Sequence, residues 1–190
     1  SVGAATGDER DKSGAMIPRD RAANRVSGVR QHRRLRYDGG MDDPQIQYTT
    51  SADGSSIAWA VAGEGMPLVV PPPALPFSHL LHELQIPEWR HWYEHLSDHL
   101  SLVRYDARGA GLSDHNVTDR TLAAEVSDLE AVIDASGFDK VVLFGLFYAG
   151  PIVIEYAARH PERVSHLILW CSFASAVDTN RDALAQTALD

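Results

Sequence analysis

The chain has 190 residues, of which 44% are hydrophobic, and its formal net charge is −9. This length and composition are enough for one domain with a buried core. Cys171 is the only cysteine, which excludes an internal disulfide and a metal cage of cysteine ligands, so we expect a reducing, cytoplasmic location. We expect Cys171 to be a small buried residue, because it ends an apolar run. No apolar stretch reaches the roughly 18 to 20 residues of a membrane-spanning helix, so no membrane partner is expected.

Positive charge is concentrated at the start of the chain. Residues 1–40 hold nine Lys and Arg against five Asp and Glu, whereas residues 41–190 hold eight against 21. Because residues 1–40 lack apolar periodicity, we predict a disordered basic N-terminal extension. Its Arg-rich part lacks the interleaved aromatic residues and docking motif of a nucleic-acid arm, so no nucleic-acid partner is expected. Alternatively, Met41 is the natural start and the basic segment lies upstream of it.

From residue 45 onward, predicted strands and helices alternate. Runs at 45–50 and 55–61 flank the turn Ser51-Ala-Asp-Gly54 and predict an antiparallel hairpin. Four continuous apolar runs predict strands of a parallel sheet, namely 67–70, 101–105, 141–144 and 167–170. Three helices are predicted between them, at 87–96, from a cap at Thr118 or Asp119 to Ala135 with Gly137 as the stop, and at 151–159. This succession predicts an α/β fold with a mostly parallel, doubly wound sheet.

Residues Gly145 to Gly150 read Gly-Leu-Phe-Tyr-Ala-Gly and join a predicted strand to a predicted helix. A strand, a sharp turn and a helix are typical of a nucleophile elbow, in which the turn lifts one side chain above the sheet. Small residues at both ends of the motif let the backbones of strand and helix approach each other. Phe147 stands where the nucleophile is expected, and it has no nucleophilic atom.

Three motifs together resemble those of the α/β-hydrolase fold family. They are Tyr105-Asp-Ala-Arg-Gly-Ala-Gly-Leu-Ser-Asp114, similar to the family's Asp-x-Arg-Gly-x-Gly-x-Ser turn, the elbow, and Ala158-Arg-His-Pro-Glu-Arg-Val164. The resemblance is to the N-terminal half of the epoxide hydrolase and haloperoxidase-like group, and to hydrolase-like domains fused to cyclase or helix-turn-helix regulators. It implies an α/β-hydrolase fold that stops after about the sixth strand, with residues 41–174 as a partial core and 175–190 as the start of a cap or a tail.

The resemblance also implies where catalytic groups should lie. In the family, the acid and the histidine follow the sixth strand, but only 17 residues follow Phe173 and none is His. The backbone N–H of Tyr148 is the candidate for one donor of the oxyanion hole. The loop that should supply the other begins with three prolines after Val70, and proline has no N–H. We therefore expect no catalytic residues in this chain and no hydrolysis by the chain alone.

Two further groups of residues suggest chemistry. Asp106, Arg108, Gly109 and Gly111 lie in the glycine-rich turn, where we expect an ion pair and hydrogen bonds to hold the loop and the glycines to allow positive φ or close approach. His91, His95 and His99 repeat every four residues. A single helix spreads such a series over about 12 Å, too far for three ligands of one ion. We therefore predict no metal site and no cofactor.

Two classes of function remain open. The first is a piece of a hydrolase whose acid and base lie in a C-terminal half that is lost or belongs to another chain. The second is a non-catalytic module of a regulator, which senses a small apolar ligand or contacts a partner protein. In either case the sixth strand presents a bare sheet edge, which predicts self-association.

Overall fold

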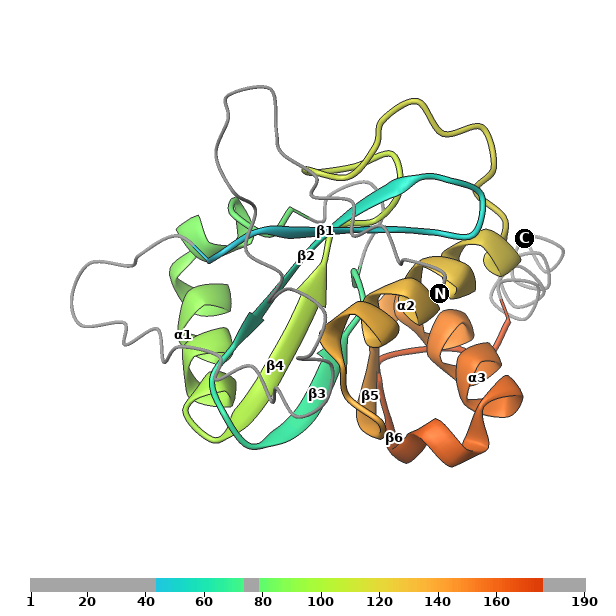
Figure 1. The fold of residues 1–190 in the computed structure, drawn as a ribbon. Coiled ribbons are helices and arrows are strands. Elements are labelled where there is room, and N and C mark those ends of the chain that lie inside the picture. The colour runs from blue at the N-terminus through green and yellow to red at the C-terminus, as the bar shows by residue number, and fades with distance from the viewer. Residues whose placement is uncertain (1–43, 74–78, 176–190) are drawn as a thin grey trace, which may run out of the picture. The chain divides into compact units, whose positions relative to one another are not determined.

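The computed structural model describes residues 44–73 and 79–175. One sheet of six strands has the order β1-β2-β4-β3-β5-β6 (Figure 1). The strands are β1 Gln47–Thr50, β2 Ser56–Ala62, β3 Met66–Val70, β4 Leu100–Tyr105, β5 Val141–Leu146 and β6 Val164–Trp170. The pairs β1–β2 and β2–β4 are antiparallel, and the other three pairs are parallel. The predicted hairpin and mostly parallel sheet are therefore confirmed.

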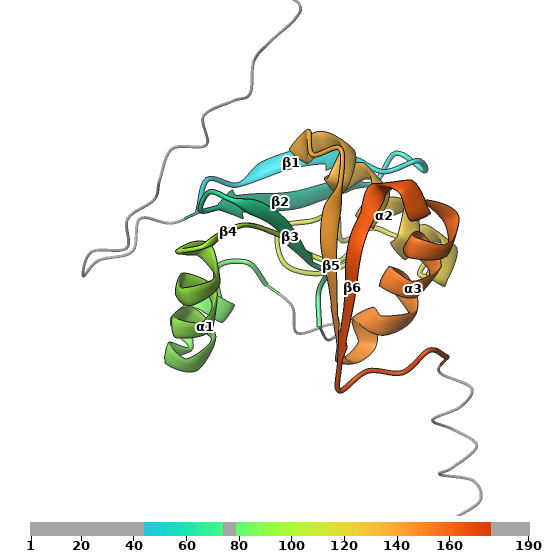
Figure 2. The same ribbon diagram turned by 90° about the horizontal axis from the view of Figure 1, so that it is seen from below.

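Helices cover both faces of this sheet (Figure 2). They are α1 Pro87–Ser97, α2 Leu122–Ser136 and α3 Gly150–Arg159, with short 3-10 turns η1 Glu83–Gln85, η2 Phe147–Ala149 and η3 Pro161–Arg163. One apolar core joins α2 and α3 to one face, and it includes Leu129, Leu143 and Val153. A second core joins α1 to the opposite face, and it includes Tyr93, Leu102 and Phe144. This is the doubly wound arrangement that the sequence predicts.

Helix α2 starts later than the sequence suggested. Its N-cap is Thr121, whose Oγ1 accepts a hydrogen bond from the N–H of Ala124 at 3.3 Å. The carboxylate of Asp119 instead accepts the N–H of Thr121 at 2.9 Å. This local turn keeps residues 119–121 out of the helix, so the prediction of a cap at Thr118 or Asp119 was wrong. Gly137 ends α2 at φ 75°, as predicted.

Strand β6 lies at one edge of the sheet (Figure 2) and, among the described residues, pairs only with β5. Four consecutive apolar residues at its end are between 39% and 56% exposed: Leu167, Ile168, Leu169 and Trp170. Cys171 follows them and is also exposed. The prediction of a buried Cys171 was therefore wrong, because none of the described strands covers this end of the edge strand.

Several predictions fall outside the described residues. They concern the basic extension, Met41 and the segment after residue 175. Within the described ranges, no helix combines the length and apolar character needed to cross a membrane.

Candidate functional site

The turn between β5 and α3 has the backbone of a nucleophile elbow. Phe147 has φ 51°, one of two positive values among the described non-glycine residues. Its neighbours must be small: a Cβ on Gly145 would lie 2.5 Å from the Cγ2 of Val153, and one on Gly150 would lie 2.6 Å from the carbonyl oxygen of Phe173. Strand, turn and helix therefore approach each other as the sequence predicts, with Phe147 at the tip.

The elbow presents aromatic rings to solvent. Phe147 is 42% exposed and Tyr148 is 64% exposed. The ring of Tyr148 packs edge-to-face on Phe173, with centroids 5.6 Å apart. The hydroxyl of Ser172 donates to the carbonyl of Phe147 at 2.7 Å, so the segment after β6 holds the turn from outside. Neither aromatic side chain at the tip offers the hydroxyl, thiol or carboxylate of a Ser, Cys or Asp nucleophile.

The predicted oxyanion donor already has an acceptor. The N–H of Tyr148 donates to the carbonyl of Pro73, with an N–O distance of 3.1 Å. Pro73 closes the proline run after β3, so this loop supplies an acceptor where an oxyanion hole needs donors. In this arrangement an anionic oxygen cannot receive that hydrogen bond without displacing Pro73.

Asp106 binds the chain around it. Its Oδ1 accepts the N–H of Leu80 and its Oδ2 accepts the N–H of Leu112, both at 2.7 Å. Burial raises the pKa of the Asp106 carboxyl, while these two N–H groups act in the opposite direction. Both oxygens are thus engaged in holding the loop, which is the structural role expected from the sequence.

Arg108 is buried, and acceptors from four segments use all five of its N–H donors. Its Nε and Nη2 form a bidentate pair with Asp128 at 2.7 and 2.6 Å, and Nη1 reaches Asp53 at 2.7 Å. The remaining acceptors are the carbonyls of Asp119 and Ala124 and the hydroxyl of Ser51. The Asp128 bond is the main cause that raises the pKa of Arg108. A cavity of about 200 Å³ adjoins this group, but Arg108 has no donor left for a ligand there.

The expected ion pair therefore exists, but Arg108 forms it with Asp128 and Asp53. The two glycines of the same loop have positive φ, 78° at Gly109 and 56° at Gly111. A Cβ on Gly111 would lie 2.2 Å from a carboxylate oxygen of Asp106. Both of the predicted reasons for glycine, positive φ and close approach, apply at this position.

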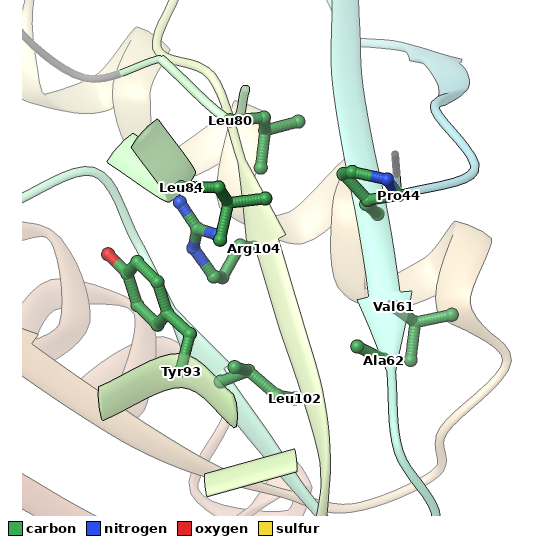
Figure 3. A pocket seen from close by; sticks show the side chains of 9 residues that line it. Pro44, Val61, Ala62, Leu80, Leu84, Tyr93, Leu102 and Arg104 are labelled. Carbon is green, nitrogen blue, oxygen red and sulfur yellow. The ribbon is translucent and has the colours of Figure 1, made fainter. Parts of the chain in front are cut away.

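A second buried polar cluster was missed by the sequence analysis (Figure 3). Arg104 lies in β4, forms a salt bridge with Glu83, and places its guanidinium carbon 3.5 Å from the ring centroid of Tyr93. The hydroxyl of Tyr93 donates to Glu83 at 2.6 Å, and burial raises the pKa of this phenol. The adjacent cavity encloses about 20 Å³, room for a single water. The cluster ties η1 and α1 to the sheet, and its signal was a charged residue inside an apolar strand.

The histidines of the predicted α1 series do not converge on a site. His95 and His99 contact each other edge-to-face at 5.8 Å. Over the described ranges, no group of three or more His, Cys, Asp or Glu side chains could hold a metal ion.

The sequence matches known proteins along most of the same region. A family model described as alpha/beta hydrolase fold matches residues 67–190. The cis-3-alkyl-4-alkyloxetan-2-one decarboxylase of Shewanella oneidensis is 28% identical over 134 residues, which is 66% of this chain and 38% of the decarboxylase. Epoxide hydrolase 3 of Xenopus tropicalis is 32% identical over 83 residues, 43% of this chain and 23% of that enzyme. The chain thus spans less than half the length of these relatives.

Solved structures agree with this. The esterase RhEst1 from a Rhodococcus species has a TM-score of 0.52 and 28% identity, covering 68% of this chain and 46% of the esterase. A hydrolase from Pseudomonas aeruginosa has a TM-score of 0.60 and 23% identity over 78% of this chain and 55% of its own, a likeness that concerns the fold alone. With its strand order, its elbow and a family match over well more than half its length, this chain belongs to the α/β-hydrolase-fold family.

Proposed function

We propose that this chain is a non-catalytic member of the family, whose elbow serves as an aromatic contact surface for a small apolar ligand. One observation carries the proposal: the backbone of the elbow is kept, at φ 51°, while Phe147 occupies the position of the nucleophile. The strained turn therefore presents an exposed aromatic ring instead of a reactive atom.

Magnitudes support the loss of hydrolysis. Removing a triad nucleophile lowers kcat by about a millionfold, equivalent to roughly 8 kcal/mol of barrier. Occupying one oxyanion donor, as Pro73 occupies the N–H of Tyr148, corresponds to a further loss of about a hundred- to a thousandfold. These losses overlap, but the first alone would reduce an ordinary turnover of about ten per second to about one per day.

The exposed rings support binding. Tyr148 is held by Phe173, and Phe147 lies next to it in the chain, so an apolar ligand could contact two rings that the backbone already orders. Aromatic side chains lose little conformational entropy on binding, which favours them as contact residues. The relatives' names describe an esterase, a decarboxylase and an epoxide hydrolase, and their apolar substrates are the chemistry against which ligands should be chosen.

Hydrolysis is tested with p-nitrophenyl acetate, p-nitrophenyl butyrate and styrene oxide on the purified chain. The wild type, Phe147→Ser and Phe147→Ala are compared after circular dichroism has established that all three are folded. We expect rates within a fewfold of buffer for all of them, because a serine hydroxyl without its base is a weak nucleophile. Multiple turnovers by the wild type that Phe147→Ala leaves unchanged would place a nucleophile elsewhere and overturn the proposal.

Binding is tested by titrating the same proteins with 1-naphthol and following intrinsic fluorescence. We expect saturable binding that weakens about tenfold or more in a Phe147→Ser, Tyr148→Ser double variant. Tyr48→Ser is the matched control, because Tyr48 is 60% exposed on β1 and lies outside the elbow. Equal affinities in all three proteins would remove the elbow as the contact surface, even if hydrolysis were absent.

A further inference from the structure

The two edge strands of the sheet differ in how they face solvent. The edge strand β1 has only four residues, Gln47, Tyr48, Thr49 and Thr50, and three of them are polar. The edge strand β6 has seven residues, Val-Ser-His-Leu-Ile-Leu-Trp, and is exposed from its second residue onward. Native edges are usually blunted by short length, charges, proline or a bulge. Strand β1 is blunted by its length, whereas β6 shows neither charges nor proline.

The apolar character of β6 extends to both of its faces. The register pairs Leu167 with Leu143 and Ile168 with Phe144, and these two partners belong to the cores on opposite faces of the sheet. Trp170 stacks on Phe144 with centroids 6.3 Å apart, and it is still 56% exposed. An added strand beside β6 would therefore bury apolar surface on both faces while it paired with the free backbone edge.

The sequence of β6 suits a second copy of itself. In a two-fold symmetric contact each residue meets the same surface on its partner, so a charged strand would face its own like charge. Residues 164–170 contain no Asp, Glu, Lys or Arg, although residues 41–190 carry a strong excess of negative charge. The strand is thus the part of an acidic surface where two copies can meet without repulsion.

We propose that β6 pairs antiparallel with β6 of a second copy, which joins two sheets into one continuous sheet of a homodimer. A two-fold axis perpendicular to the sheet makes the two copies of one strand antiparallel. A single strand edge buries less than the roughly 800 Å² per partner of a standard complex. The dimer is therefore weak, with a Kd on the order of micromolar or above.

Sedimentation velocity of the full chain, from about one to several hundred micromolar, measures this dimer. We expect the wild type to shift from monomer to dimer, and Ile168→Lys to remain monomeric because it places like charges across the two-fold axis. Tyr48→Lys is the matched control on the opposite edge and should dimerise like the wild type. A wild type that stays monomeric throughout, or a dimer unchanged by Ile168→Lys, would overturn the proposal. Open-ended assemblies would also contradict it, because a two-fold contact closes.

A distance measurement on the wild type does not depend on a folded variant. Cys171 is the only cysteine, is exposed and directly follows β6, so one spin label per copy reports the pairing. Antiparallel strands centred near residues 167–168 place the two Cys171 residues about 20–30 Å apart at about 3.3 Å per residue. A label distance below about 15 Å would mean parallel strands or contact through the strand ends, and would exclude the proposed register.

Discussion

Two glycine-rich turns follow neighbouring buried strands of the sheet, and they use their side chains in opposite ways. The turn after β4 directs Asp106 and Arg108 inward, where every donor of Arg108 and both carboxylate oxygens of Asp106 are engaged. The turn after β5 directs Phe147 and Tyr148 outward, where both are largely exposed. The first turn is held by its own polar side chains, whereas the second is held by small residues and by contacts to its backbone.

The difference explains why the elbow can survive without a nucleophile. Its geometry depends on the close approaches at Gly145 and Gly150 and on the bond from Ser172 to the carbonyl of Phe147. None of these involves the side chain at position 147. The turn after β4, by contrast, cannot lose Arg108 without leaving the buried Asp128 unpaired. One turn separates shape from chemistry, and the other does not.

Breaking the first turn should have the largest effect. Arg108→Ala leaves the carboxylate of Asp128, whose side chain is 2% exposed, without its partner, and we expect a loss of about 3–5 kcal/mol in the free energy of unfolding. Urea denaturation followed by circular dichroism measures it. Arg159→Ala is the control, because it removes an exposed i,i+4 pair with Glu155 and should cost about 0.5 kcal/mol or less. Equal losses in the two variants would contradict the structural role of Arg108.

The second turn should show its strain in a smaller effect. Phe147→Gly and Phe147→Ala both delete the ring, so their difference isolates the backbone at φ 51°. We expect the glycine variant to be more stable by about 1 kcal/mol in urea denaturation, because alanine is strained in the left-handed region. The same pair at Ser127 within α2 is the control and should show the reverse order by about 1 kcal/mol. Alanine at 147 matching or exceeding glycine would mean that the turn relaxes.

The smallest effect concerns pH. The backbone N–H of Ser55, followed by Arg108, lowers the pKa of Asp53 from 3.8 to about 2. A carboxyl with a depressed pKa adds stability above its unfolded value, and that stability is lost as the pH falls toward the folded value. The wild type should therefore be more stable than Asp53→Asn at pH 5, and the difference should shrink between about pH 4 and about pH 2. Urea midpoints at pH 5, 4, 3 and 2.5 measure this, and a difference independent of pH would refute it.

The sequence predicted the backbone better than the contacts between side chains. Continuous apolar runs located the four parallel strands, and the spacing of Gly145, Ala149 and Gly150 located the elbow, because both depend on neighbours in the chain. The partners of Arg108 lie 20 and 55 residues away. No local period reveals such pairings, since only the tertiary fold brings the groups together.

Two misses have different causes. Arg104 did carry a signal, since a charged residue in a buried strand requires a partner, but the sequence could not show that Glu83 and Tyr93 supply it. The bond from Tyr148 to Pro73 carried none, because both groups are backbone atoms and any sequence has them. Sequence reasoning therefore indicated which residue fails as a nucleophile, whereas only the structure showed that the neighbouring donor is already in use.

The reach of Arg108 also bears on how the fold opens. Its side chain joins Ser51 and Asp53 in the hairpin turn to Ala124 and Asp128 in α2. A short edge hairpin would ordinarily fray among the first parts of a domain. Here it cannot detach without exposing an ion pair inside the protein, so the hairpin turn and the first half of α2 form one cooperative unit. The edge strand β1 is thereby as long-lived as the helix to which it is tethered.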